Sequence, residues 1–197
     1  MTRLIIATHN KHKLIEFKDM LSPLGYEVVS LFDLGYFNEI EETGASFSEN
    51  SYIKAKTIYD HFHEAVIADD SGIMVDALHG LPGIYSHRYS GENATDKSNR
   101  IKLINDLKSL NLKHYPARFI CDITYIDNNK TIKTEGTLEG EIVLEERGDN
   151  GFGYDPIFYL KDYSKCVAEL TEETKNTLSH RHNALIKLIE ELKKWKS

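Results

Sequence analysis

The stretch that decides the fold runs from Ala65 to Gly91 and reads AVIADDSGIMVDALHGLPGIYSHRYSG. Its apolar run Val66–Ala68 predicts a buried strand, because β-branched side chains fit a pleated surface. The run ends at the tetrad Asp69–Gly72 and resumes as Ile73–Val75. Two adjacent carboxylates at the end of an apolar strand are costly to bury unless a cation binds them. The tetrad is therefore either a solvated turn, since Asp, Ser and Gly are common turn residues, or a cation-binding segment.

The residues after the tetrad favour the second interpretation. Four turn-forming residues surround the segment Ser86–Tyr89, namely Gly80, Pro82, Gly83 and Gly91. The basic residue Arg88 therefore lies in a glycine-rich loop close in sequence to the acidic tetrad. This composition is typical of the wall of a cleft, where a ligand approaches the backbone.

Length and composition indicate a single folded domain over residues 1–197, with 41% hydrophobic and 28% charged residues. The net charge of −7 argues against a partner of the nucleic-acid class, because duplex binding requires many phosphate contacts from Lys and Arg. A small anionic ligand is still compatible, since lysines and a metal can reverse the field within one cleft.

Compartment and membrane association follow from what the chain lacks. Its two cysteines, Cys121 and Cys166, have neither a disulfide-framework pattern nor a zinc spacing. No apolar run has the length of a membrane span, and the N-terminal residues do not resemble a signal peptide. We therefore expect a cytoplasmic protein without membrane contact.

The N-terminal residues combine a strand with the start of a helix. The apolar run Arg3–Thr8 predicts the first strand, and Asn10 can cap a helix that follows it. A helix N-terminus offers amide N–H groups to an anion, and Thr8, Lys11 and Lys13 add polar and positive groups there. The alternative is an ordinary capped helix with solvated lysines.

The remaining periodicities predict further strands and helices. Strands are expected at residues 26–30, 117–126 and 131–143, the last two forming a hairpin around a turn at 127–130. Helices are expected at residues 46–65 and 95–110, from Thr171, and after a cap at Ser179. Ser46 and Glu49 fit a capping box, which is an alternative to any catalytic role for Glu49.

Two C-terminal segments have the composition of a binding site. The loop at residues 148–158 contains Gly151, Phe152 and Gly153, and an aromatic ring on such a loop suits stacking on a planar base. The alternative is an aromatic anchor of an irregular loop. The last helix begins with His180, Arg181 and His182, whose positive charge opposes the helix dipole and so weakly favours a ligand-facing role.

Taken together, these motifs resemble the inosine/xanthosine triphosphate pyrophosphatase family. The matching segments extend over nearly the whole chain: Thr8-His9-Asn10 with Lys13 and Glu16; Glu41 to Gly44; Phe47-x-Glu49-Asn50; Lys54-Ala55; Ala68 to Gly72; Leu81-Pro82-Gly83; Ser86-x-Arg88-Tyr89; Gly151 to Pro156; Ala168-Glu169-Leu170; Lys175-Asn176; and Ser179-His180-Arg181. Each motif alone is unspecific, whereas their order and spacing are specific. His12 and His87 depart from the family pattern, which often has glycine and a small residue there.

The resemblance implies a fold, a reaction and partners. The fold is α/β, an elongated mixed β-sheet flanked by helices, with two lobes and a central nucleotide-binding cleft. The reaction is the Mg²⁺-dependent hydrolysis of ITP, dITP or XTP to the monophosphate and pyrophosphate, carried out by a homodimer.

The resemblance also implies roles for individual residues. It assigns catalysis to Asp70 and Asp69, and the metal to Glu41 and Asp70. It assigns substrate binding to Thr8, His9, Asn10, Lys11, His12, Lys13, Lys54, Ser71, Phe152, Gly153, Tyr154, Asp155, Lys175, His180 and Arg181. Asp70 is the proton acceptor in the family, but a metal-bound carboxylate is a weak base. A metal-polarised water that Asp69 or Asp70 only orients is an open variant.

Base selection follows from hydrogen-bond polarity. Arg181 or His180 can donate to the 6-keto group of inosine or xanthosine, whereas adenine presents an amino donor at that position. The rejection of guanine, which also has a 6-keto group, does not follow from these residues.

Two other functional classes are compatible with parts of the pattern. One is a nucleotide sensor that binds without hydrolysis, against which the acidic and basic site residues speak. The other is a pyrimidine-directed pyrophosphatase, which the Ser179-His180-Arg181 segment disfavours. A substrate panel with detection of pyrophosphate separates all three.

Overall fold

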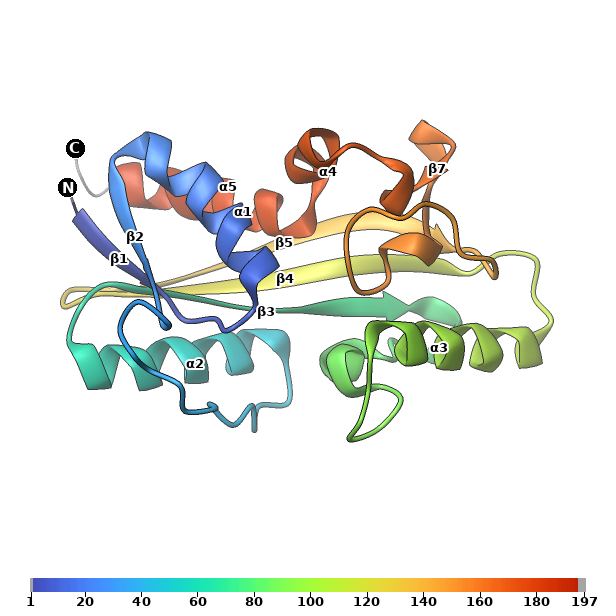
Figure 1. Ribbon diagram of the computed structural model, residues 1–197, viewed down its shortest axis with the longest axis horizontal. Helices are drawn as coiled ribbons and strands as arrows, with labels where there is room; N and C mark the ends of the chain where they lie inside the picture. The colour runs from blue at the N-terminus through green and yellow to red at the C-terminus, as the bar shows by residue number, and fades with distance from the viewer. Residues whose placement is uncertain (1, 195–197) are drawn as a thin grey trace. The chain divides into compact units, whose positions relative to one another are not determined.

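The computed structural model of the chain describes residues 2–194. Within these residues one seven-stranded sheet has the order β2-β1-β3-β4-β5-β6-β7. Its strands are β1 (Thr2–Ile6), β2 (Tyr26–Ser30), β3 (Val66–Val75), β4 (Pro116–Ile126), β5 (Thr131–Ile142), β6 (Phe158–Leu160) and β7 (Lys165–Cys166). The helices are α1 (Lys11–Leu21), α2 (Phe47–Phe62), α3 (Asp96–Leu110), α4 (Glu172–Leu178) and α5 (His180–Lys194). The mixed α/β sheet flanked by helices confirms the predicted fold class (Figure 1).

Contacts divide the chain into two units. The first unit comprises residues 2–70, 121–136 and 182–194, and the second comprises residues 71–120 and 137–181. Strand β3 belongs to the first unit as far as Asp70 and to the second from Ser71. The prediction that residues 1–197 act as one two-lobed domain stays a prediction. None of the helices within residues 2–194 has both the length and the apolarity to cross a bilayer.

In the first unit, helices cover both faces of parallel strands. Strand β1 pairs in parallel with β2 and with β3. Alternate side chains point to opposite faces, so Ile6 packs with α1 and α5 while Ile5 packs with α2. Figure 1 shows α1 and α5 on one side of these strands and α2 on the other. A parallel strand covered on both faces needs an apolar sequence, as RLIIAT has.

The helix starts follow the predicted capping chemistry. The Asn10 side chain accepts hydrogen bonds from the backbone N–H groups of His12 and Lys13, at 2.9 and 3.2 Å. Ser46, Thr95 and Thr171 cap α2, α3 and α4 in the same way. Helix α2 ends at Phe62 rather than at Ala65, because His63 adopts a left-handed conformation with φ 54° and bonds back to Tyr59.

Of the two interpretations of Asp69–Gly72, the structure does not show the solvated turn. Strand β3 continues without interruption through the tetrad to Val75. Its central position between β1 and β4 satisfies the backbone groups on both sides, and lysine side chains from α1 and α2 pair with the two carboxylates. The local sequence indicates a turn because these partners lie far away in the chain.

In the second unit, α3 and α4 flank the strands on opposite sides (Figure 1). Its core joins Leu103 and Leu107 of α3 with Ile73 of β3 and Phe158 of β6. The backbone of β5 approaches β6 closely at Gly140, where an added Cβ would lie 2.5 Å from the Phe158 ring. The short antiparallel strands β6 and β7 extend the sheet beyond β5.

Candidate active site

The first unit contains a cluster of buried carboxylates and lysines at the end of its part of β3. Asp69 and Asp70 come from β3, Lys13 from α1, Lys54 from α2, and Glu42 from the loop before α2. We call these five residues the acid–lysine cluster. The structure thus brings together residues that are as many as 57 positions apart in the sequence, from Lys13 to Asp70 (70 − 13).

Asp69 is held by groups from two other elements. Its side chain is 1% exposed, and its Oδ2 lies 2.8 Å from the Lys13 Nζ. The Cys121 thiol of β4 donates to the same oxygen over 3.8 Å. An unpaired buried carboxylate is strongly destabilising. The Lys13 ammonium therefore stabilises the folded chain by compensating the charge of Asp69.

Lys54 joins Asp70 to the acidic loop. Its Nζ lies 2.6 Å from the Glu42 Oε1 and 3.6 Å from the Asp70 Oδ1. Burial alone lowers the pKa of the Lys54 ammonium, but the neighbouring carboxylates, with Asp70 the strongest, raise that pKa above its ordinary value. Lys54 is therefore a fixed positive charge.

Opposing influences act on the pKa of the Asp70 carboxyl. Burial raises the pKa of its carboxyl above the ordinary value, the Lys54 ammonium opposes that rise, and Glu42 adds to it. The Asn50 amide donates to the Asp70 Oδ2 at 3.0 Å. This group thus has a proton affinity above that of a solvated aspartate, which suits an acceptor of a proton.

A further carboxylate, Asp122 of β4, is influenced by Asp70 and was not among the predicted site residues. Burial, together with the charges of Glu135 and Asp70, raises the pKa of Asp122 to about 6, while Lys133 opposes the shift. The available signal was an acidic residue inside the otherwise regular strand ARFICDITYI.

The charge of this region fits a divalent cation. The carboxylates of Glu42, Asp69 and Asp70 act together with the ammonium groups of Lys13 and Lys54, so three negative charges meet two positive ones. All the acidic donors are oxygens, which hard cations prefer. Within residues 2–194 no three His, Cys, Asp or Glu side chains gather into a metal-binding group. Mg²⁺ is commonly held by one or two carboxylates together with phosphates and water, and the residues fit that mode.

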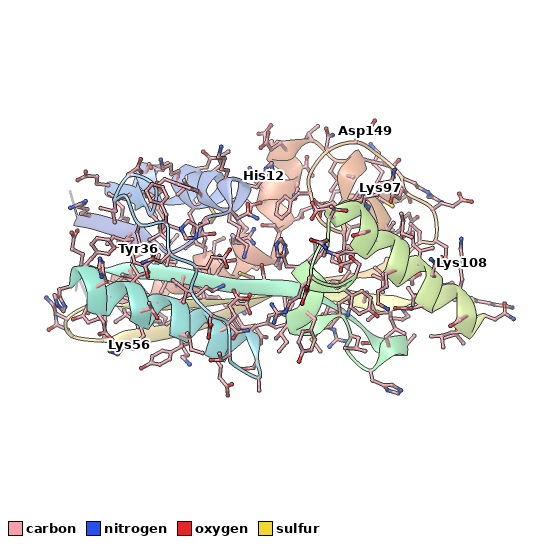
Figure 2. The ribbon with its side chains drawn as sticks, turned by 60° about the horizontal axis from the view of Figure 1, so that its bottom comes forward. His12, Tyr36, Lys56, Lys97, Lys108 and Asp149 are labelled. Atoms are coloured by element: carbon pink, nitrogen blue, oxygen red, sulfur yellow. The ribbon has the colours of Figure 1, made fainter. Side chains whose placement is uncertain are left out.

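The other predicted residues of the first unit do not all reach the cluster. Glu41 is exposed, while its neighbour Glu42 contacts Lys54. Thr8 accepts a hydrogen bond from the Asn10 N–H, and the His9 Nε2 lies 3.1 Å from the Tyr36 carbonyl oxygen. Lys11 and His12 are exposed in the first turn of α1, where Figure 2 labels His12. The predicted roles of these residues remain predictions.

Glu49 has a structural role at the start of α2, which was the alternative to a catalytic role. The Ser46 side chain accepts from the Glu49 N–H at 3.2 Å, and the Glu49 carboxylate accepts from the Ala45 N–H at 2.7 Å. The reciprocal bond of a capping box therefore comes from Ala45, one residue before the cap. Glu49 closes the loop onto the first turn of α2.

The second unit gathers the predicted base-binding residues into two groups. In one, the Lys175 Nζ of α4 lies 2.7 Å from the Asp155 Oδ2 and 4.4 Å from the centre of the Phe152 ring. The same carboxylate oxygen accepts from the Phe152 N–H at 2.9 Å. Asp155 therefore orders the glycine-rich loop around Phe152.

Gly151 is essential to this arrangement. An added Cβ at Gly151, where φ is +80°, would lie 2.2 Å from the Asp155 carboxylate. The Gly153 carbonyl accepts from the Arg100 guanidinium at 2.8 Å, and the Tyr154 hydroxyl donates to the Ser86 carbonyl at 2.8 Å. The loop is thus held directly after Phe152, at Gly153 and Tyr154; Figure 2 labels Asp149 on the same loop.

The other group lies at the start of α5. Arg181 is 2% exposed, and its guanidinium donates to the Ser71 hydroxyl at 3.2 Å. The His180 ring stacks on Phe119 at 4.9 Å with an angle of 15° between the planes. Packing therefore restrains both predicted donors for the purine edge. Ser86 has a structural role instead, because its hydroxyl accepts from the Ile73 N–H and donates to the Gly83 carbonyl.

Comparison with known proteins identifies the family. The profile of the Ham1 family matches residues 4–191. This chain belongs to the Ham1 family. A protein named dITP/XTP pyrophosphatase from Bacillus licheniformis is 50% identical over 189 residues, which cover 95% of this chain and 96% of that protein. A protein of the same name from Bacillus subtilis is 48% identical, and the match again covers 95% of this chain and 96% of that protein.

A solved structure agrees with the sequence relatives. The Ham1 protein of Staphylococcus aureus is 40% identical, with a TM-score of 0.89 and full coverage of both chains. The Ham1 membership confirms the family resemblance that the motifs carry.

Proposed function

We propose that this Ham1 protein hydrolyses the non-standard purine triphosphates ITP, dITP and XTP to the monophosphate and pyrophosphate, with Mg²⁺. The names of the relatives support this substrate class. The observation that carries the reaction is the acid–lysine cluster, in which Lys13 contacts Asp69 and Lys54 contacts Asp70. We further propose that residues 1–197 act as one catalytic domain, as a homodimer in the cytoplasm, without nucleic-acid or membrane partners.

The metal is needed to balance charge. Lys13 and Lys54 already pair with carboxylates, so a triphosphate alone would meet a region with excess negative charge. Asp70 and, by family resemblance, Glu41 would hold Mg²⁺ together with phosphate oxygens and water. Once bound, the ion neutralises phosphate charge and lowers the pKa of a coordinated water.

The two lysines have further donors for the substrate. An ammonium group carries three N–H donors, and each lysine uses only part of this capacity on the carboxylates. Their remaining donors can bind oxygens of the triphosphate, where fixed positive charge stabilises the transition state.

In the proposed reaction, a water oxygen bonds to the α-phosphorus. The bond between that phosphorus and the oxygen bridging to the β-phosphate breaks, and pyrophosphate leaves with the bridging oxygen. A proton of the attacking water passes to a carboxylate of β3. Asp70, which Asn50 and Lys54 contact from α2, is the proposed acceptor or orients the water, and Asp69 is held by Lys13 as an oriented negative charge.

The base is assigned to the residues of the second unit. Phe152 would stack on the purine, with Gly153, Tyr154, Asp155 and Lys175 shaping the loop around it. Arg181 or His180 would donate to the 6-keto oxygen. A buried guanidinium facing the amino group of adenine would be left without an acceptor, which supplies strong discrimination.

The proposal is tested with a substrate panel. Purified protein is incubated with ITP, dITP, XTP, ATP, GTP and CTP, with Mg²⁺ or with EDTA, and the products are separated as pyrophosphate or phosphate. We expect pyrophosphate from the first three substrates, at least about 100-fold faster than from ATP, with activity lost in EDTA and restored by Mg²⁺. Phosphate as the product, or equal rates on ATP and ITP, would contradict the proposal.

A further inference from the structure

Asn50 belongs to the motif Phe47-x-Glu49-Asn50, but the family resemblance assigns it no role. It lies in the second turn of α2 and is fully buried. Its side-chain Nδ2 donates to the Asp70 Oδ2 at 3.0 Å, and its Oδ1 accepts from the Gly44 N–H at 2.8 Å. Both halves of the carboxamide are thus used, one on β3 and the other on the acidic loop.

Helix α2 holds both oxygens of Asp70. Asn50 and Lys54 are four residues apart, so they lie on the same face of the helix. Asn50 contacts the Oδ2 and Lys54 the Oδ1 of the same carboxylate. Because one helix contacts both oxygens, the plane of the Asp70 carboxylate is restrained relative to α2.

The same helix also holds the acidic loop. Three contacts connect the loop to α2: Glu42 to Lys54 at 2.6 Å, the Gly44 N–H to Asn50 at 2.8 Å, and the Ala45 N–H to Glu49 at 2.7 Å. Of these α2 residues, Asn50 and Lys54 bind the loop and Asp70 together. Lys54 does so through charge, and Asn50 does so through directional hydrogen bonds.

We propose that Asn50 is the positioning residue that sets the acidic loop, which carries Glu41 and Glu42, in register with Asp70. This inference rests on the proposed function, because it concerns the same carboxylates. A carboxamide suits the role: a carboxylate at position 50 has no donor for Asp70 and repels it, and an aliphatic side chain has neither a donor for the Asp70 Oδ2 nor an acceptor for the Gly44 N–H.

Asn99 of α3 provides a matched control. It is 2% exposed, and its carboxamide also connects two segments, accepting from the Ser90 N–H at 2.8 Å and donating to the His87 carbonyl at 2.9 Å. Its partners include backbone groups and no carboxylate, and it lies in the second unit. Replacing Asn99 therefore removes the same kind of buried bridge without touching Asp70.

The kinetic test compares Asn50→Asp with Asn99→Asp on dITP and Mg²⁺. We expect Asn50→Asp to lower kcat about 100-fold while KM for the nucleotide changes less than about threefold, because misplacement of a reacting group acts on the transition state. Asn99→Asp should keep kcat within about threefold. A kcat for Asn50→Asp equal to that of Asn99→Asp would overturn the inference.

Gly44→Ala tests the loop end of the bridge. An added Cβ at Gly44 would lie 2.7 Å from the Asn50 Oδ1 and 2.6 Å from the Glu49 Cβ. It therefore displaces the loop while the hydrogen bond between Asn50 and Asp70 can persist. We expect a fall in kcat smaller than that of Asn50→Asp, about tenfold; unchanged kcat would remove the loop from the inference.

A second readout uses the protein without metal or nucleotide. Urea unfolding of Asn50→Ala, Asp70→Ala and the double variant forms a thermodynamic cycle. We expect a coupling of about tenfold or more in the unfolding equilibrium constant, as for a hydrogen bond to a charged group, and none in the parallel cycle of Asn99→Ala with Asp70→Ala. Absent coupling overturns the inference even if the enzyme is active. If the wild type releases no pyrophosphate, the proposed function fails, and this cycle still decides whether Asn50 positions Asp70.

Discussion

Buried lysine–aspartate pairs occur in both units, but they have different charge environments. In the first unit, Lys13 and Lys54 meet the three carboxylates of Glu42, Asp69 and Asp70, and Asp70 also raises the pKa of Asp122. In the second unit, Lys175 and Asp155 form one pair at 2.7 Å, and the same Asp155 oxygen accepts from the Phe152 N–H. The first region is charge-unbalanced, whereas the second is balanced.

This difference indicates separate tasks. An excess of buried negative charge is costly unless a cation completes it, so the acid–lysine cluster is suited to a metal and a triphosphate. A lysine–aspartate pair whose charges cancel adds little destabilisation of its own, and it holds the loop that it anchors in one conformation. The second unit is therefore suited to holding Phe152 and Arg181 in place for recognition.

Neutralising one aspartate in each region should give the sharpest contrast. Asp70→Asn should lower kcat on ITP by about 10³-fold or more, because it removes the proposed proton acceptor, while nucleotide binding in calorimetry is largely kept. Asp155→Asn should retain kcat within about tenfold. If Asp70→Asn stays active, the assignment of the reaction to the first unit is lost.

Removing one lysine from each region tests the charge imbalance through stability. Lys13→Met leaves the Asp69 carboxylate buried beside other acids, and we expect a loss of about 3 kcal/mol in the free energy of unfolding. Lys175→Met should cost about 1 kcal/mol, since Asp155 keeps its hydrogen bond to the Phe152 N–H. Urea titrations of both variants measure the difference, and equal losses would refute the contrast.

Arg181→Ala tests recognition in the second unit. We expect the preference for ITP over ATP, measured as the ratio of kcat/KM values, to fall about 100-fold, while kcat on ITP falls less than tenfold. Ser71→Ala removes only the hydroxyl that accepts from Arg181 and should change the preference a few-fold, about threefold. An unaltered preference in Arg181→Ala would exclude base reading by this residue.

Asp122 gives the smallest effect, on the pH dependence of stability. Its pKa is raised from 3.8 to about 6 in the folded chain, so the folded state binds a proton that the unfolded state has lost between these values. This group therefore makes stability fall as pH rises from about 4 to 6. Asp122→Asn should remove that component and stabilise the protein at pH 7 by about 1 kcal/mol, a figure reduced for solvent screening because the residue is partly exposed.

The control for this prediction is the difference between the two unfolding curves against pH. Other carboxylates, such as Asp106 and Asp127, have lowered pKa values and give the opposite slope. They are common to both proteins and cancel in the subtraction. A difference curve that is flat from pH 4 to 6 would show that Asp122 does not carry the proton.

The sequence was sufficient where local rules decide structure. Asn10, Ser46 and Thr95 cap the helices that their positions predict, and strand β2 has the predicted bounds. It was insufficient where distant residues decide: the tetrad at Asp69 continues a strand because lysines from two helices pair with it.

The candidate site divides in the same way. The motif around Asn50 was visible in the sequence, but its contact with Asp70 depends on the packing of α2 against β3. Asp122 was hidden because neither its own motif nor its neighbours mark a carboxylate whose pKa depends on tertiary burial. Residue types and their order are thus readable from the chain, whereas charge balance is a property of the folded unit.

Isotope labelling tests the central claim most directly. The protein is incubated with ITP and Mg²⁺ in ¹⁸O-labelled water, and the products are analysed by mass spectrometry. Attack at the α-phosphorus places one labelled oxygen in the inosine monophosphate and none in the pyrophosphate, which is the predicted result. Label in the pyrophosphate, or release of phosphate from the terminal position, would contradict the account.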